Sequence, residues 1–277
     1  MTGATCPTVT ALPPWRITCQ SHSWQLYRDS KEVRVPPPLA ADGTTVVFVG
    51  EFKPVWISPS WLHDHGQISD AELAEVQFEL LIPNEAITFK VGWVRCVGNA
   101  QQLQFETQQE AEFERLRDLA VAVLRATPDL ELGLMGINRI VHFEVPSLDA
   151  WHAVGDNLVR NDLMSNVLHL SGLRSVTFWG TRPDMYGGRI QVQVEPSFQF
   201  PRSVFVTYND HYDLSVVDRQ PADRHEMTEL ARAEDASRSK EKTANAVSIL
   251  SNQWEPSMRR FNNILETVWR TAEAGDA

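Results

Sequence analysis

The sequence contains little cysteine. Its three cysteines, Cys6, Cys19 and Cys96, lack the spacing of metal ligands, and their odd number leaves at least one thiol unpaired. Unpaired thiols are typical of proteins that stay in a reducing compartment. A disulfide-stabilised secreted scaffold is therefore disfavoured, and we expect a cytoplasmic protein.

Long apolar runs are missing as well. No stretch approaches the ~18 consecutive apolar residues of a membrane-spanning helix. Residues 1–15 combine neither the basic segment nor the apolar segment of a secretory signal. We therefore expect no membrane partner.

Basic residues are outnumbered by acidic ones. The chain has 25 Lys and Arg against 36 Asp and Glu, which gives a formal net charge of −11. Its longest basic cluster, Arg238–Lys242, is interrupted by Glu241. Proteins that neutralise nucleic-acid phosphates usually carry a basic face. Nucleic acid is therefore disfavoured as a partner.

The motifs of common catalytic and cofactor sites are absent too. The glycine-containing stretch GLMGIN, residues 133–138, lacks the Lys and Ser/Thr of a P-loop and the three glycines of a dinucleotide site. No Gly-x-Ser-x-Gly elbow is present, and no cysteine lies in a catalytic signature. We expect no cofactor, and the pattern favours a non-enzymatic protein.

Alternating hydrophobicity predicts antiparallel strands. Residues 44–52 are expected to form a buried strand, and residues 86–98 to form one continuous strand that a hairpin at Gly98–Gln101 joins to the next. Apolar residues from Phe113 to Leu124 follow helical spacing. Residues 130–145 are predicted to be a strand with a bulge at Gly133 or Gly136.

These segments predict an α+β fold in two loosely repeated halves, each a strand meander followed by a helix. The expected divisions are a proline-rich leader or strap (1–43), the two halves (44–146 and 147–217), a polar linker (218–240) and a long C-terminal helix (241–277). The prolines of the leader favour an extended surface segment.

The stretch VTYNDHYDLS, residues 206–215, is the main candidate site. Its polar residues are Asn209, Asp210, His211 and Asp213. They are consistent with a turn that ends a strand, because Asn and Asp bond to nearby backbone there. They are also candidates for a ligand-binding or acid–base cluster. We favour the turn and keep the cluster as the alternative.

Two further groups have ordinary explanations beside functional ones. His63 and His65 flank Asp64, but on the short helix predicted after Pro59 they point apart and cannot share one metal ion. Five tryptophans occur in patterned segments and are expected to fill the core rather than line a pocket. They are Trp56, Trp61, Trp93, Trp151 and Trp179.

The C-terminal helix carries an apolar stripe at heptad-like spacing. Its interface candidates are Val247, Leu250, Phe261, Leu265 and Val268. The stripe either packs on the chain's own sheet or pairs with a partner, and we expect a homodimer or a heteromer formed partly through it. Pro256 is expected to kink or restart the helix.

Three segments in order resemble a sporadically distributed bacterial family of similar length with no established function. They are VGEFKPVWISPSWL from Val49, LMGIN from Leu134 and VFVTYNDHYDL from Val204. The resemblance implies a bacterial cytosolic protein and suggests a place in a mobile or defence-associated locus. It assigns no functional residue.

Two functions remain open from the sequence. The first is a non-enzymatic interaction or sensor subunit of a bacterial cytosolic complex, supported by the C-terminal stripe, the negative charge and the missing catalytic motifs. The second is a small-ligand binder or hydrolase with its site near Asn209–Asp213.

Overall fold

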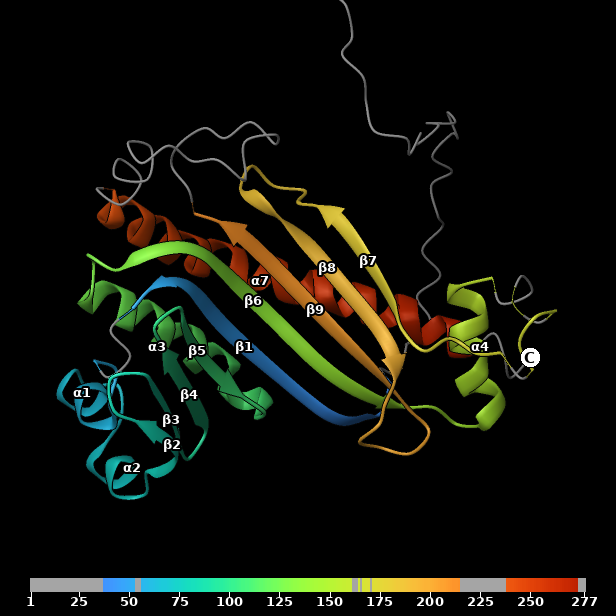
Figure 1. Ribbon diagram of the computed structural model, residues 1–277, viewed down its shortest axis with the longest axis horizontal. Coiled ribbons are helices and arrows are strands. Elements are labelled where there is room, and N and C mark those ends of the chain that lie inside the picture. The colour runs from blue at the N-terminus through green and yellow to red at the C-terminus, as the bar shows by residue number, and fades with distance from the viewer. Residues whose placement is uncertain are drawn as a thin grey trace, which may run out of the picture. The chain divides into compact units, whose positions relative to one another are not determined.

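A computed structural model describes residues 37–52, 56–160, 164, 166–169, 171–214 and 238–273. All of them belong to one unit, Pro36–Ala277. The leader expected over residues 1–43 and the linker expected over 218–240 lie mostly outside the described residues. Figure 1 shows that the described strands form one sheet crossed by a long helix.

The sheet is antiparallel throughout, in the order β2-β3-β4-β5-β1-β6-β9-β8-β7. The strands are β1 (Leu39–Glu51), β2 (Gln77–Ile82), β3 (Ala86–Val91), β4 (Val94–Asn99), β5 (Gln102–Thr107), β6 (Glu131–Glu144), β7 (Val176–Thr181), β8 (Gly187–Pro196) and β9 (Ser203–Asp213). The helices are α1 (Pro59–Asp64), α2 (Asp70–Ala74), α3 (Phe113–Ala126), α4 (Leu148–Leu158) and α7 (Ser239–Glu273), with a 3-10 turn, η1 (Glu110–Glu112).

The α+β fold with two repeated halves is confirmed, but the boundary between the halves lies before β6 and not after residue 146, where the sequence pattern placed it. Each half begins with a long central strand, β1 or β6, and returns to it through the last strand of its meander, β5 or β9. Each then ends with a helix, α3 or α7. The two halves meet at the β1–β6 pair, so they share one continuous sheet rather than two.

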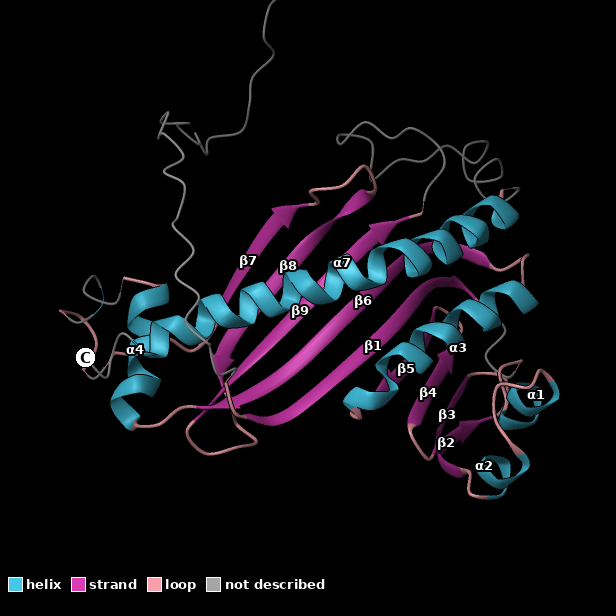
Figure 2. Ribbon diagram, turned by 180° about the vertical axis from the view of Figure 1, so that it is seen from behind, coloured by secondary structure: helices cyan, strands magenta, loops and turns pink. Residues whose placement is uncertain are grey.

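Helices α3 and α7 both lie across the same face of this sheet, as Figure 2 shows. Alternate strand residues therefore point toward the helices or toward the opposite face, which we call the open face. Val46, Ile137 and Val206 point toward the helices and are fully buried. No helix of the described chain crosses the open face over β1, β6, β9 and β8.

Three local expectations are confirmed. Helix α1 begins after Ser58, whose hydroxyl accepts a hydrogen bond from the Trp61 amide, with Pro59 in the first turn. The predicted hairpin joins β4 to β5. The bulge falls at Gly133, because Val49 pairs with Leu134 while Gly50 pairs with Leu132.

Two strand boundaries were wrong. The strand expected over residues 86–98 is split into β3 and β4, since Gly92 adopts a positive φ of 46° and lets the chain reverse. Strand β1 begins at Leu39 rather than Thr44. Its first residues pair with β6, Leu39 with Phe143 and Gly43 with Ile140, so this end of the expected leader belongs to the sheet.

The C-terminal helix is more continuous and more buried than expected. It continues through Pro256 without a restart, as α7. Leu250, Phe261, Leu265 and Val268 are buried against the chain's own sheet, and Val247 packs against the same core. The assignment of the four buried residues as interface residues was therefore wrong, because the chain's own sheet covers them.

Candidate functional site

The polar stretch after Val206 is part of a strand, not a turn. Strand β9 extends to Asp213 and pairs with β6 on one side and β8 on the other. The turn prediction for Asn209, Asp210, His211 and Asp213 was wrong, because ladder hydrogen bonds satisfy this backbone instead of the side chains. Alternation places Asp210 toward the helices and the other three on the open face.

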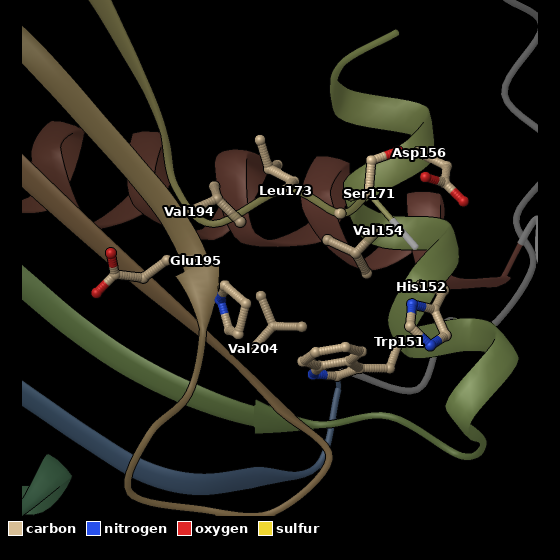
Figure 3. Close-up of a pocket in the computed structure, with 12 residues that line it drawn as sticks. Trp151, His152, Val154, Asp156, Ser171, Leu173, Val194, Glu195 and Val204 are labelled. Carbon is tan, nitrogen blue, oxygen red and sulfur yellow. The ribbon is translucent and has the colours of Figure 1, made fainter. Parts of the chain in front are cut away.

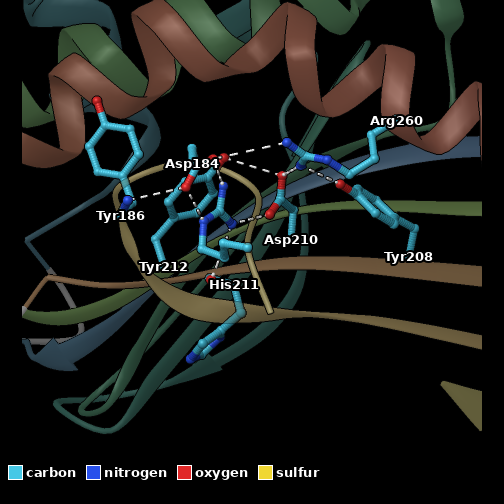
Figure 4. Close-up of polar contacts among 8 residues, drawn as sticks. Asp184, Tyr186, Tyr208, Asp210, His211, Tyr212 and Arg260 are labelled. Carbon is cyan, nitrogen blue, oxygen red and sulfur yellow. Dashed lines mark hydrogen bonds and ion pairs between the residues drawn. The ribbon is translucent and has the colours of Figure 1, made fainter. Parts of the chain in front are cut away.

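Asp210 lies in a buried ionic network between the sheet and α7 (Figure 4). It is fully buried and forms ion pairs with Arg182, from the β7–β8 connection, and with Arg260 of α7, whose Nη1 lies 2.8 Å from Oδ2. Tyr212 donates its hydroxyl to the same carboxylate at 3.2 Å. The network thus joins three parts of the chain that are distant in sequence.

The network also holds a second carboxylate. Arg182 donates Nε and Nη2 to the two oxygens of Asp184, at 2.9 and 2.6 Å. Burial opposes ionisation of Asp184, but the hydrogen bonds and charge of Arg182 outweigh it, so the pKa of this carboxyl is lowered. Two arginines therefore face two aspartates, and their ion pairs offset the cost of removing these charges from water.

Two tyrosines complete this arrangement and are held neutral. Burial, reinforced by the charge of Asp210, raises the pKa of Tyr208 to about 12 and raises that of Tyr212 as well. Arg260 donates to the Tyr208 hydroxyl at 2.9 Å, and the Arg182 guanidinium lies 3.5 Å from the Tyr212 ring centroid. These phenols are structural hydrogen-bonding groups rather than acids at neutral pH.

The network fixes the strand whose other face is open. Arg182 also donates Nη1 to the backbone carbonyl of His211, at 3.3 Å. On the face covered by the helices, β9 is anchored by Tyr208, Asp210 and Tyr212. On the open face, the same strand projects Asn209 and His211. Asp210 is therefore a positioning residue for the open face.

A hollow of ≈ 220 Å³ lies on the open face at the middle of the sheet. Its side-chain lining comes from four strands and consists of Val47 and Val49 (β1), Leu134 and Asn138 (β6), Asn209 and His211 (β9), and Arg189 and Gln191 (β8). Two of the residues that the sequence nominated, Asn209 and His211, thus meet here. Asp210 faces away, and Asp213 is not part of the lining.

Gly136 creates the hollow. It stands between His211 and Val47 in one cross-strand row, where any larger residue would place a side chain. A Cβ there would lie 3.0 Å from the side-chain oxygen of Asn138, two residues along the same face. The neighbouring row contains three amides side by side, since Asn209 pairs with both Asn138 and Gln191.

The two sides of the hollow differ in chemistry. Val47, Val49 and Leu134 supply an apolar side over β1 and β6. The β8–β9 side is polar, with Arg189 directly opposite His211 in the ladder. Such a mixed lining, with a few convergent polar groups beside apolar ones, is typical of small-molecule sites.

A second hollow, of ≈ 300 Å³, lies between α4 and the ends of β8 and β9 (Figure 3). Trp151, Val154 and Leu173 line it, with His152 and Glu195 at its edges. Trp151 donates its indole N–H to the Ser203 carbonyl at 3.2 Å, so that group is already used. Its lining is mainly apolar and brings no row of polar groups together.

No family model matches the chain, and no curated protein matches it. The candidate site therefore rests on its own geometry.

The remaining candidates are dispersed. His63 bonds to Asp70 at 2.7 Å, whereas His65 bonds to the Trp61 carbonyl and stacks on that indole. Among the described residues no group of three or more His, Cys, Asp and Glu is placed to hold a metal. In the same part of the chain, no helix is both long and apolar enough to cross a membrane.

Sequence reasoning missed most of the hollow. Gly136 and Asn138 lay in a predicted strand whose glycines suggested only a bulge and matched no phosphate or dinucleotide motif. Arg189 and Gln191 lay in an alternating strand with no motif. The available signal was the alternation of β8 itself, where Arg189, Gln191 and Gln193 put consecutive polar side chains on one face.

Proposed function

We propose that the chain is a non-enzymatic binding protein, a sensor subunit of a cytoplasmic complex, which holds a small ligand in the hollow at Gly136. The observation that carries this proposal is the convergence of Asn138, Asn209 and Gln191 on a hollow in the open face. Amide groups donate and accept hydrogen bonds but do not titrate near neutral pH. They suit recognition of a ligand rather than proton transfer to it.

The buried network supports the same function. A binding site is selective when its groups are held in place before the ligand arrives. The ion pairs of Asp210 anchor β9 on the helix side and thereby hold Asn209 and His211 at the hollow. The helix-side face of β9 thus stabilises the fold, and its open face contributes residues to the binding site.

Replacing Gln191 with leucine is expected to weaken ligand binding about three- to tenfold, since it removes one hydrogen bond to the ligand. Wild-type protein is first screened against a library of small polar metabolites by thermal shift, because a ligand that binds the folded state raises the melting temperature. The affinity of each hit is then measured by calorimetry.

The matched control is Gln193→Leu. Gln193 lies two residues along β8 on the same face, but outside the hollow, where it bonds to Ser175 and Glu195. It should leave ligand affinity unchanged. Equal affinities for the wild type and both variants, for every hit, would refute a site at Gly136.

A further inference from the structure

We infer that the ligand of this hollow is a small organic anion, with a carboxylate or phosphate at one end and a compact apolar body at the other. The inference rests on the proposed binding function and adds the chemical class. It follows from the arrangement of Arg189, Trp179 and the apolar side of the hollow.

Unlike several other arginines around the sheet, Arg189 has no carboxylate partner among the described residues. Arg95, Arg139 and Arg182 each hold a carboxylate, those of Glu106, Asp42 and Asp184 respectively. Arg189 lines the hollow, and within the described residues it forms no ion pair. In a chain with net charge −11, this leaves an uncompensated guanidinium beside a cavity.

The guanidinium is held in place without being neutralised. Its central carbon lies 4.2 Å from the ring centroid of Trp179, which is on the next strand and 65% exposed. An aromatic face orients an arginine by a cation–π contact and leaves its N–H groups available. Those groups form a planar fork that matches the two oxygens of a carboxylate or phosphate.

The rest of the hollow selects the remainder of the ligand. From Arg189 the cross-strand row continues through His211 and Gly136 to Val47. An anionic group bound at Arg189 would place a short apolar body over Gly136 and against Val47 and Val49. The amides of Asn138 and Asn209 run alongside, so they can bond to polar substituents on that body.

A defined set of probes tests the charge requirement. Benzoate carries a carboxylate on a phenyl ring, and phenyl phosphate carries a phosphate on the same ring. Benzyl alcohol replaces the anion with a neutral group, and benzylammonium replaces it with a cation. Both anions should bind the wild type at least tenfold more tightly than the other two, measured by titration calorimetry at low salt. The ratio between the two anions shows which oxyanion the site prefers.

Arg189→Gln should weaken binding of both anions about tenfold or more, because a hydrogen bond to a charged group is lost. Binding of benzyl alcohol should stay unchanged. Arg174→Gln is the matched control, since Arg174 lies 5.2 Å from the ring centroid of Phe198, outside the hollow. Side-chain amide NMR signals of Asn138 and Asn209 should shift with benzoate in the wild type.

Three outcomes would overturn the inference: benzylammonium binding as tightly as benzoate, Arg189→Gln keeping anion affinity within about twofold, or neither anion binding at millimolar concentration. Failure of this inference is distinct from failure of the proposed function. Neutral ligands whose affinity depends on Gln191 but not on Arg189 would uphold the hollow as a site and reject only its preference for anions.

Discussion

Asp210→Ala is expected to lower the free energy of unfolding by about 3–5 kcal/mol, because it removes one of the two carboxylates that compensate the buried Arg182 and the partly buried Arg260. Asp210 is fully buried and bonds to Arg182, Arg260 and Tyr212. Asp184 would still neutralise part of the charge of Arg182, but the vacated space next to Arg260 would not be filled. Urea unfolding followed by circular dichroism measures the change.

Two variants calibrate this result. Asp210→Asn keeps the shape and some hydrogen bonds but removes the charge, so its loss of stability should fall below that of the alanine variant. Asp118→Ala removes an exposed carboxylate on α3 that pairs with Arg117, and it should change stability by less than about 1 kcal/mol. A loss for Asp210→Ala as small as that for Asp118→Ala would contradict the network's role.

The double variant Phe261→Glu, Leu265→Glu is expected to unfold the chain. Phe261 is fully buried on α7 and Leu265 is nearly so, and both pack on the β6–β9 half of the sheet. Burying an ionised carboxylate without a partner costs several kcal/mol, so two exceed the stability of a typical domain. Loss of the circular dichroism signal of the sheet is the measurement.

Asn262→Glu, Asn263→Glu adds the same two charges to the same turn of α7 at exposed positions. This control should remain folded. If instead the Phe261 and Leu265 variant stayed folded and only its mass in light scattering fell, the stripe would be a subunit interface after all. That outcome would reverse the correction drawn from the burial of α7.

The fold was predictable where side-chain periodicity determines local structure. The strand around Val46 is a β-branched apolar run, the strand around Phe105 alternates clearly, and the helix from Phe113 has a single apolar face. The end of β9 was not predictable, since Asn209 and Asp210 are common in turns. Their place in a strand depends on β6 and β8, which pair with them on both sides.

The site was predictable only in part for the same physical reason. Asn209 and His211 stood out as polar residues in one short stretch, whereas Asn138, Arg189 and Gln191 join them only through strand pairing. The ion pair between Asp210 and Arg182 was not predictable either, because Arg182 lies in a connection whose path the sequence pattern does not specify. The local sequence pattern identifies candidate residues, whereas the strand pairing determines which of them become neighbours.

The two meanders extend outward from the central pair β1 and β6, and this strand order has a consequence for synthesis on the ribosome. Val46, in the middle of β1, pairs with Phe105 on one side and with Ile137 on the other, so β1, the first of the described strands to be made, must wait for both neighbours. Ile137 in turn pairs with Asp210. Pairings this distant in sequence slow folding, and the nascent first half therefore emerges with one edge of β1 uncovered until β6 has left the exit tunnel.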